Sequence, residues 1–120
     1  MTNPPYAVII EDDAMLSLIF QTTLQNAGFD TALDIYGNQY QGLIEAEQPA
    51  LMILDLHLPY ASGVDILADV RVRCPKTVIA IVSADIFKLK DLEGKADYVL
   101  VKPISVARLL KIAETVKEAL

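Results

Sequence analysis

The sequence has no tryptophan, one histidine and one cysteine. Cys74 has no second cysteine with which to pair, so an internal disulfide and a cysteine-rich zinc site are both excluded, and a cytoplasmic location is expected. Glycine and proline are scarce as well, at 5 and 6 of 120 residues, which excludes collagen-like and low-complexity chains. We therefore expect a globular fold, with residues 1–120 forming one domain.

Basic residues and long apolar runs are also in short supply. Ten lysines and arginines stand against sixteen aspartates and glutamates, for a net charge of −6. This charge repels nucleic acid and anionic lipid, so we expect neither as a direct partner. The apolar runs, such as residues 50–54, are far shorter than the ~20 residues of a membrane span. The N-terminus also lacks the basic and then apolar pattern of an export signal.

Short apolar runs alternate along the chain with segments of helical periodicity. Strands are predicted at 6–10, 31–35, 51–54, 78–82 and 98–101, and helices at 14–27, 39–47, 64–73, 86–92 and from 106 onward. Because the strands are apolar throughout rather than at alternate positions, they predict a parallel sheet with helices on both faces. In such α/β sheets ligands bind at the carboxyl ends of the strands, where the strand order reverses.

Four of the five predicted strands end in chemically useful side chains. They are Glu11, Asp12 and Asp13 after the first strand, Asp55 after the third, Ser83 after the fourth, and Lys102 with Pro103 after the fifth. Carboxylates gathered at one sheet edge raise each other's pKa values unless a cation neutralises them. Oxygen ligands without histidine or cysteine side chains favour a hard ion such as Mg²⁺. Asp55 is then a candidate nucleophile that could form an aspartyl phosphate, with charge offset by Mg²⁺ and Lys102.

Four segments at these strand ends make the chain resemble the receiver domain of two-component response regulators, the chemotaxis-type phosphoacceptor module. The segments are the acidic pair in IIEDD, the stretch DLHLPYASG at 55–63, Ser83-Ala84 and Lys102-Pro103. The resemblance covers residues 6 to about 116. It implies a flavodoxin-like, doubly wound (βα)5 fold with a five-stranded parallel sheet in the order 2-1-3-4-5, and no output domain within these 120 residues.

The resemblance also implies a function. The chain would accept a phosphoryl group from a histidine kinase or phosphotransfer protein onto Asp55 in a Mg²⁺-dependent phosphorelay reaction, and would signal through protein contacts. Such a domain is a signalling protein rather than an enzyme, although it catalyses its own phosphorylation and dephosphorylation.

Individual roles follow from the same resemblance. The implied Mg²⁺ ligands are Asp12 directly, Glu11 through water, the Asp55 carboxylate and the backbone carbonyl of His57. Ser83 and Lys102 would hold the phosphoryl oxygens, and the Lys102-Pro103 peptide bond is expected to be cis. Asp13 is expected to cap the following helix.

Two features depart from the family pattern. Receivers usually have a tyrosine or phenylalanine three residues before the lysine, where this chain has Val99. Tyr98 should point to the opposite face of its strand and so should not replace that aromatic. The segment between Ser83 and Lys102 is also about one helical turn shorter than usual. Its helix should be stunted, which predicts a non-standard partner surface.

Further predictions concern two residues beside the site and the surface of the first predicted helix. His57 lies two residues after Asp55, where its side chain would tune hydrolysis of the aspartyl phosphate, and Asp85, two residues after Ser83, is its counterpart on the opposite side. Met15 and Leu18 would form a docking patch for a histidine kinase or phosphotransfer protein if both are exposed; the alternative is that other parts of the fold cover them.

Three other functions share parts of this pattern. A haloacid-dehalogenase-type phosphatase would need a second aspartate at position 57, where this chain has histidine. A flavodoxin-like cofactor binder would need a glycine-rich or hydroxyl-rich phosphate loop, whereas the turn after the first strand reads EDDAML. A pseudo-receiver, acting as an interaction module independently of phosphorylation, is favoured by the displaced aromatic residue and the short helix, and stays open as the alternative.

Overall fold

Strands and helices alternate strictly along the chain in the computed structural model, which describes residues 3–120. The strands are β1 (Tyr6–Ile10), β2 (Asp30–Asp34), β3 (Leu51–Asp55), β4 (Val78–Ser83) and β5 (Tyr98–Val101). The helices are α1 (Ala14–Asn26), α2 (Tyr40–Ala46), α3 (Gly63–Arg73), α4 (Ile86–Asp91) and α5 (Val106–Glu118). Every predicted element is present, with ends within one or two residues of those expected.

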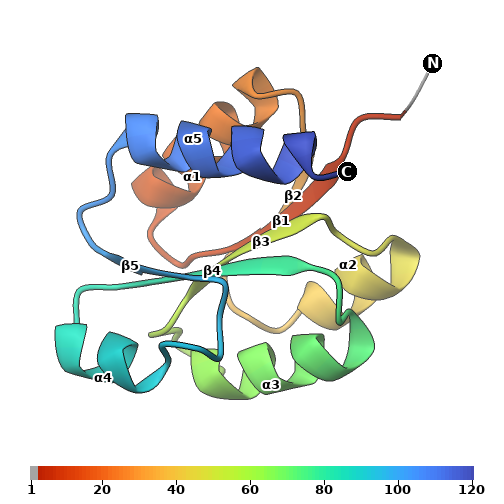
Figure 1. Ribbon diagram of the computed structural model, residues 1–120. Coiled ribbons are helices and arrows are strands. Elements are labelled where there is room, and N and C mark those ends of the chain that lie inside the picture. Colours follow the sequence, from red (N-terminus) through yellow and green to blue (C-terminus); the bar gives the residue numbers. More distant parts are fainter. Residues whose placement is uncertain (1–2) are drawn as a thin grey trace.

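The strands form one parallel sheet in the order β2-β1-β3-β4-β5. Helices α1 and α5 cover one face, and α2, α3 and α4 cover the other (Figure 1). The predicted doubly wound fold and strand order are therefore confirmed. The carboxyl ends of all five strands point to the left in Figure 1, away from both termini. After β1 the chain adds β2 on one side of β1 and then β3 on the other side. The direction in which strands are added thus reverses here, and the carboxyl ends of β1 and β3 define the switch point.

Each face of the sheet has its own hydrophobic cluster. Ile9 and Ile53 pack under α1 and α5, while Val8 and Met52 pack under α2, α3 and α4, and all four side chains are fully buried. Because successive side chains of a strand point to opposite faces, a central strand covered on both sides must be apolar at every position. This explains the continuous apolar runs in β1 and β3 and the rigid platform on which their carboxyl ends stand.

The edge strand β5 shows the predicted split between neighbouring residues. Tyr98 packs with the cluster under α1 and α5, and Val99 packs with the cluster under α2, α3 and α4. The prediction that Tyr98 does not take the place of the usual aromatic is therefore confirmed. That place, on the α4 side of the sheet, holds the smaller side chain of Val99.

Helix ends follow local chemistry. The Asp13 side chain accepts a hydrogen bond from the Leu16 N–H at 2.9 Å, so it caps α1 as predicted. After α1 the chain turns at Gly28, whose φ of +96° suits glycine. Helix α4 has 6 residues and is the shortest helix within residues 3–120, as expected for a stunted helix. Within residues 3–120, no helix has both the length and the apolar character needed to cross a bilayer.

Candidate functional site

Three carboxylates converge at the carboxyl ends of the neighbouring strands β1 and β3. Glu11 and Asp12 directly follow β1, and Asp55 is the last residue of β3, whose Leu54 pairs with Ile10. One carboxylate oxygen from each of the three lies within 4.8 Å of the others. Glu11 and Asp55 are buried and Asp12 is exposed. The sheet thus brings together three residues that are up to 44 positions apart in sequence.

Lys102 reaches this cluster from the end of β5. Its Nζ atom lies 2.9 Å from Glu11 Oε1 and 3.3 Å from Asp55 Oδ2. The peptide bond between Lys102 and Pro103 is cis, as predicted. Lys102 is therefore the cation that offsets part of the negative charge at the sheet edge.

The environment of Glu11 opposes its ionisation. Its side chain has no exposed surface, and this burial, with the nearby Asp55 carboxylate, raises the pKa of Glu11 to about 7 although Lys102 acts in the opposite direction. Within the described chain the contact of its Oε1 atom with the Lys102 ammonium, at 2.9 Å, is an ion pair without hydrogen-bond geometry. The single Lys102 ammonium therefore does not fully neutralise the charge of the two buried carboxylates. A further cation at this edge of the sheet would be stabilised.

Asp55 and Lys102 are held in their charged forms. Burial on its own would raise the pKa of Asp55, but interactions with Glu11, the His57 N–H and Lys102 outweigh it and lower that pKa. The His57 N–H donates to Asp55 Oδ1 at 3.0 Å. Burial would lower the pKa of Lys102, yet Glu11 and Asp55 raise it above its usual value. A carboxylate that stays ionised in a buried place is suited to act as a nucleophile.

Ser83 and Asp85 form the β4 side of the site. Ser83 is buried, and its Oγ atom accepts a hydrogen bond from the Asp85 N–H at 3.0 Å. Asp85 in turn caps α4, accepting from the N–H groups of Phe87 and Lys88, both at 3.1 Å. The Ser83 hydroxyl hydrogen therefore remains available to a ligand, while the Asp85 carboxylate is already engaged in the helix cap.

Gly63 shapes the loop that follows Asp55. Its N–H donates to the Leu56 carbonyl at 3.3 Å, and a bridge joins His57 to Ser62 in the same loop. A Cβ atom at Gly63 would lie only 2.7 Å from the Asp55 carbonyl oxygen. The glycine is therefore required for the close approach of the loop to the strand end that holds Asp55.

One buried carboxylate at a strand end escaped the sequence analysis. Asp34 ends β2, is fully buried, and accepts hydrogen bonds from four backbone N–H groups, those of Tyr36, Gly37, Gln39 and Tyr40, at 2.7–3.2 Å. These bonds tie the loop before α2 to the sheet edge. The predicted strand runs from 31 to 35 and so places Asp34 inside it, and nothing in the sequence marks this aspartate as the end of the strand or separates its structural role from a catalytic one.

The donor set fits Mg²⁺. Carboxylate oxygens of Glu11, Asp12 and Asp55 lie within 4.8 Å of one another, and Mg²⁺ prefers oxygen ligands from a few carboxylates with water in its other positions. The raised pKa of Glu11, despite the Lys102 ammonium 2.9 Å from its Oε1 atom, fits a cluster that can accept further positive charge. The structure thus brings together the predicted side-chain ligands, while the exposed His57 contacts Asp55 through its backbone N–H.

Comparison with known proteins gives a consistent result. The model of the response regulator receiver domain family matches residues 7–114. Similar solved structures include the receiver domain of the Francisella response regulator 1452, with 24% identity and a TM-score of 0.83 over 96% of this chain and 98% of that one. A CheY-like receiver domain from Methylobacillus flagellatus has 25% identity and a TM-score of 0.82 over 94% and 98% of the two chains.

A third similar structure is a sensor protein from Polaromonas, with 25% identity and a TM-score of 0.82 over 96% of this chain and 97% of that one. The family match includes four strands and four helices completely and most of β1 and α5, and it covers every residue of the acidic cluster as well as Ser83 and Lys102. The chain therefore belongs to the response regulator receiver domain family of two-component signal transduction.

Proposed function

We propose that this receiver domain accepts a phosphoryl group on Asp55 from the phosphohistidine of a histidine kinase or phosphotransfer protein. The observation that carries the proposal is the position of Asp55, whose buried carboxylate lies beside the carboxylates of Glu11 and Asp12 and 3.3 Å from the Lys102 ammonium. Phosphoryl transfer to a carboxylate requires positive charge around the nucleophile, which Lys102 supplies in part and a cation bound at the acidic cluster would complete.

In the proposed reaction an Asp55 carboxylate oxygen attacks phosphorus, the P–O bond forms, and the P–N bond to the donor histidine breaks. Lys102 stabilises charge on the transferring group from the β5 side. Ser83 donates its hydroxyl to a phosphoryl oxygen while still accepting from the Asp85 N–H. Mg²⁺ held by Asp12, Asp55 and the His57 carbonyl, with Glu11 acting through water, would offset further negative charge.

Hydrolysis of the aspartyl phosphate completes the proposed cycle. His57 is exposed and lies two residues after Asp55, whose carboxylate its backbone N–H contacts, so we place its side chain where it would meet water approaching the phosphoryl group. We expect His57→Ala to change the lifetime of the phosphorylated protein, measured as loss of the adduct after the donor is removed. Equal decay rates for variant and parent would remove His57 from the proposal.

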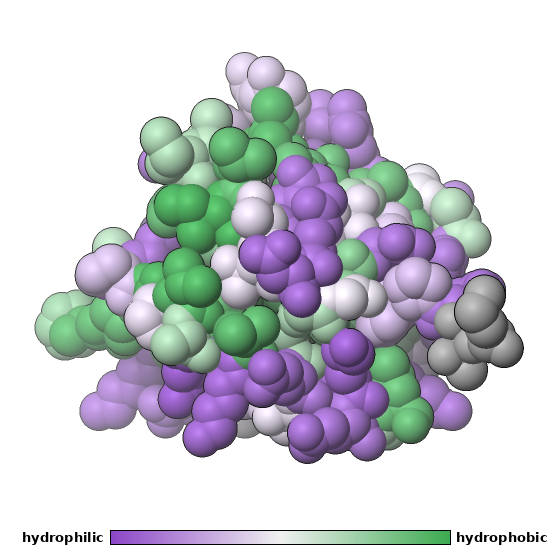
Figure 2. Space-filling model, turned by 90° about the horizontal axis from the view of Figure 1, so that it is seen from above, coloured by the Kyte–Doolittle hydropathy of each residue, from purple (hydrophilic) through white to green (hydrophobic). Residues whose placement is uncertain are grey.

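The proposed phosphodonor binds at α1. Met15 and Leu18 are 67% and 56% exposed, so no other part of the described chain covers them. Figure 2 looks down on the face formed by α1 and α5 and shows hydrophobic residues gathered on the side toward the carboxyl ends of the strands. An apolar patch beside the nucleophile is suited to dock a helical partner and deliver its histidine. We place this encounter in the cytoplasm, where the free thiol of Cys74 would stay reduced.

The test is intact mass after incubation with acetyl phosphate, with and without Mg²⁺. The parent should gain one phosphoryl group only with Mg²⁺, and Asp55→Asn should gain none. Asp12→Asn should react much more slowly, while the matched variant Asp13→Asn, which keeps a helix-capping side chain, should react like the parent.

The second candidate is a pseudo-receiver that signals by binding alone. Val99 in the usual aromatic position and the six-residue α4 favour it, because both lie on the surface that would report phosphorylation. Absence of any adduct in the parent under all conditions would support this candidate and contradict the phosphoacceptor proposal.

A further inference from the structure

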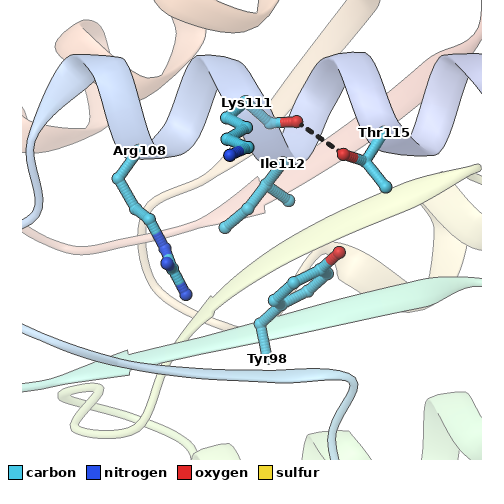
Figure 3. A pocket seen from close by; sticks show the side chains of 5 residues that line it. All are labelled: Tyr98, Arg108, Lys111, Ile112 and Thr115. Carbon is cyan, nitrogen blue, oxygen red and sulfur yellow. Dashed lines mark hydrogen bonds between the residues drawn. The ribbon is translucent and has the colours of Figure 1, made fainter.

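A second cluster of polar groups lies far from Asp55, in a hollow between β5 and α5. Figure 3 shows the five residues that line it, Tyr98, Arg108, Lys111, Ile112 and Thr115. The cavity has a volume of about 120 Å³. Tyr98 begins β5, whereas Lys102 of the phosphoacceptor site follows its end, so the two places are about 13 Å apart along the strand. The hollow is therefore separate from the site described above.

The walls of the hollow are apolar and its rim is polar. The buried side chain of Ile112 forms the floor, and the half-buried ring of Tyr98 forms one wall. The Tyr98 hydroxyl makes no hydrogen bond within the described chain, although the ring that carries it is fixed by packing. Thr115 closes one side, and its hydroxyl donates to the Lys111 carbonyl at 2.9 Å. Tyr98 thus presents a free donor at the rim.

Two cations stand at the same rim without a counter-ion. Within residues 3–120, neither Arg108 nor Lys111 has a carboxylate within 4.0 Å, as is also true of the other surface lysines, but these two cations line the same hollow. The acidic residues of α5, Glu114 and Glu118, do not reach them. Unpaired cations one helical turn apart repel each other, so an anion placed between them is stabilised by both.

We propose that this hollow binds one small anion bearing a carboxylate or phosphate group. Arg108 would hold two of its oxygens with the guanidinium fork, Lys111 would add a point charge, and the Tyr98 hydroxyl would donate to a third position. The remainder of the ligand would lie on the Tyr98 ring and Ile112. The volume is well below the roughly 300–1,000 Å³ of pockets for larger ligands, so the occupant is a single small group and not a nucleotide.

The test is a titration of the isotope-labelled protein with inorganic phosphate and, separately, with acetate, followed by amide chemical shifts at constant ionic strength. Saturable shifts should appear at Tyr98, Lys111 and Thr115. The double variant Arg108→Ala/Lys111→Ala should bind at least about tenfold more weakly. The double variant Lys76→Ala/Lys88→Ala, which loses the same charge elsewhere on the surface, should bind within about twofold of the parent.

Tyr98→Phe distinguishes a built site from general attraction to positive charge. It leaves the charge of the protein unchanged and removes one neutral hydrogen bond, so the affinity should fall roughly three- to tenfold. Stronger binding of phosphate assigns the site to phosphate compounds, and stronger binding of acetate assigns it to carboxylates. Shifts that do not saturate, or equal affinities in the two double variants, would overturn the proposal. Neither readout involves Asp55, so the result is independent of phosphorylation.

Discussion

The Lys102 ammonium lies closer to Glu11 than to Asp55, at 2.9 Å against 3.3 Å, and Glu11 has no exposed surface. The lysine therefore links two buried carboxylates that would otherwise repel each other. In this arrangement ionisation is disfavoured at Glu11, whose pKa is raised, and favoured at Asp55, whose pKa is lowered. Asp55 thus stays ionised while Glu11 is the carboxyl that protonates more readily. A nucleophilic carboxylate must be ionised to react.

Replacing Glu11 by glutamine should stabilise the metal-free protein above neutral pH. The carboxyl ionises near pH 4.5 in the unfolded chain but only near pH 7 in the folded protein, so the parent loses stability as the pH rises through this window. The glutamine variant does not titrate here. Its free energy of unfolding relative to the parent should therefore increase by roughly 1–3 kcal/mol between pH 4 and pH 8.

Urea denaturation in the presence of a chelator at both pH values measures this difference. Glu118→Gln, an exposed position on α5, is the matched control and should show little change at either pH. A Glu11→Gln effect that is the same at pH 4 and pH 8 would contradict the raised pKa.

Two glycine substitutions should have opposite effects. A Cβ atom at Gly63 would lie 2.7 Å from backbone atoms of Asp55 and Leu56, so Gly63→Ala must displace the loop and should destabilise the fold by roughly 1–3 kcal/mol. Gly42 lies inside α2 with no atom within 4 Å of such a Cβ, so Gly42→Ala should stabilise by about 0.4–1 kcal/mol. Thermal unfolding compares the two, and a neutral Gly63→Ala would show that the loop is not tightly constrained.

Removing the Asp34 carboxylate should lower the free energy of unfolding without changing the proposed phosphorylation reaction. Four backbone N–H groups lose their acceptor in Asp34→Ala, and those of Gly37 and Tyr40 are buried, which should reduce the free energy of unfolding by roughly 3 kcal/mol or more. At a temperature where the variant is still folded, its phosphorylation should stay Mg²⁺-dependent. A variant that folds as stably as the parent would show that water or other groups replace these bonds.

Added Mg²⁺ should stabilise the protein through the acidic cluster. An ion that binds only the folded state stabilises it by RT ln(1 + c/Kd) at a free Mg²⁺ concentration c and so raises the melting temperature, and Asp12 offers the most accessible carboxylate of the three. The Mg²⁺-dependent rise should therefore be much smaller in Asp12→Asn than in the parent. Asp13→Asn should keep the full rise, and a rise that is equal in all three proteins would place the ion elsewhere.

The fold could be predicted from the sequence because its signals are local and repeated. Apolar runs that stop abruptly, as Val8 to Ile10 does before Glu11, mark strands buried on both faces, and their alternation with helical segments leaves few topologies. The meeting of Glu11, Asp12 and Asp55 follows from the parallel sheet itself, since carboxyl ends of neighbouring strands share an edge.

What could not be predicted depends on three-dimensional distances and burial. No pattern in the sequence shows that Lys102 contacts Glu11 more closely than Asp55, or that Asp34 serves only backbone N–H groups. The hollow beside Tyr98 was also missed, because it arises from the packing of β5 against α5. Whether Arg108 and Lys111 find a counter-ion is decided by side-chain reach rather than by spacing.

The most direct measurement is to locate the phosphoryl group itself. Protein treated with acetyl phosphate and Mg²⁺ is reduced with borohydride, which converts an aspartyl phosphate to homoserine, and the product is digested and sequenced by mass spectrometry. The account predicts homoserine at position 55, dependent on both reagents. Homoserine at another aspartate, or an unmodified Asp55 in a protein that carries the phosphoryl mass, would contradict it.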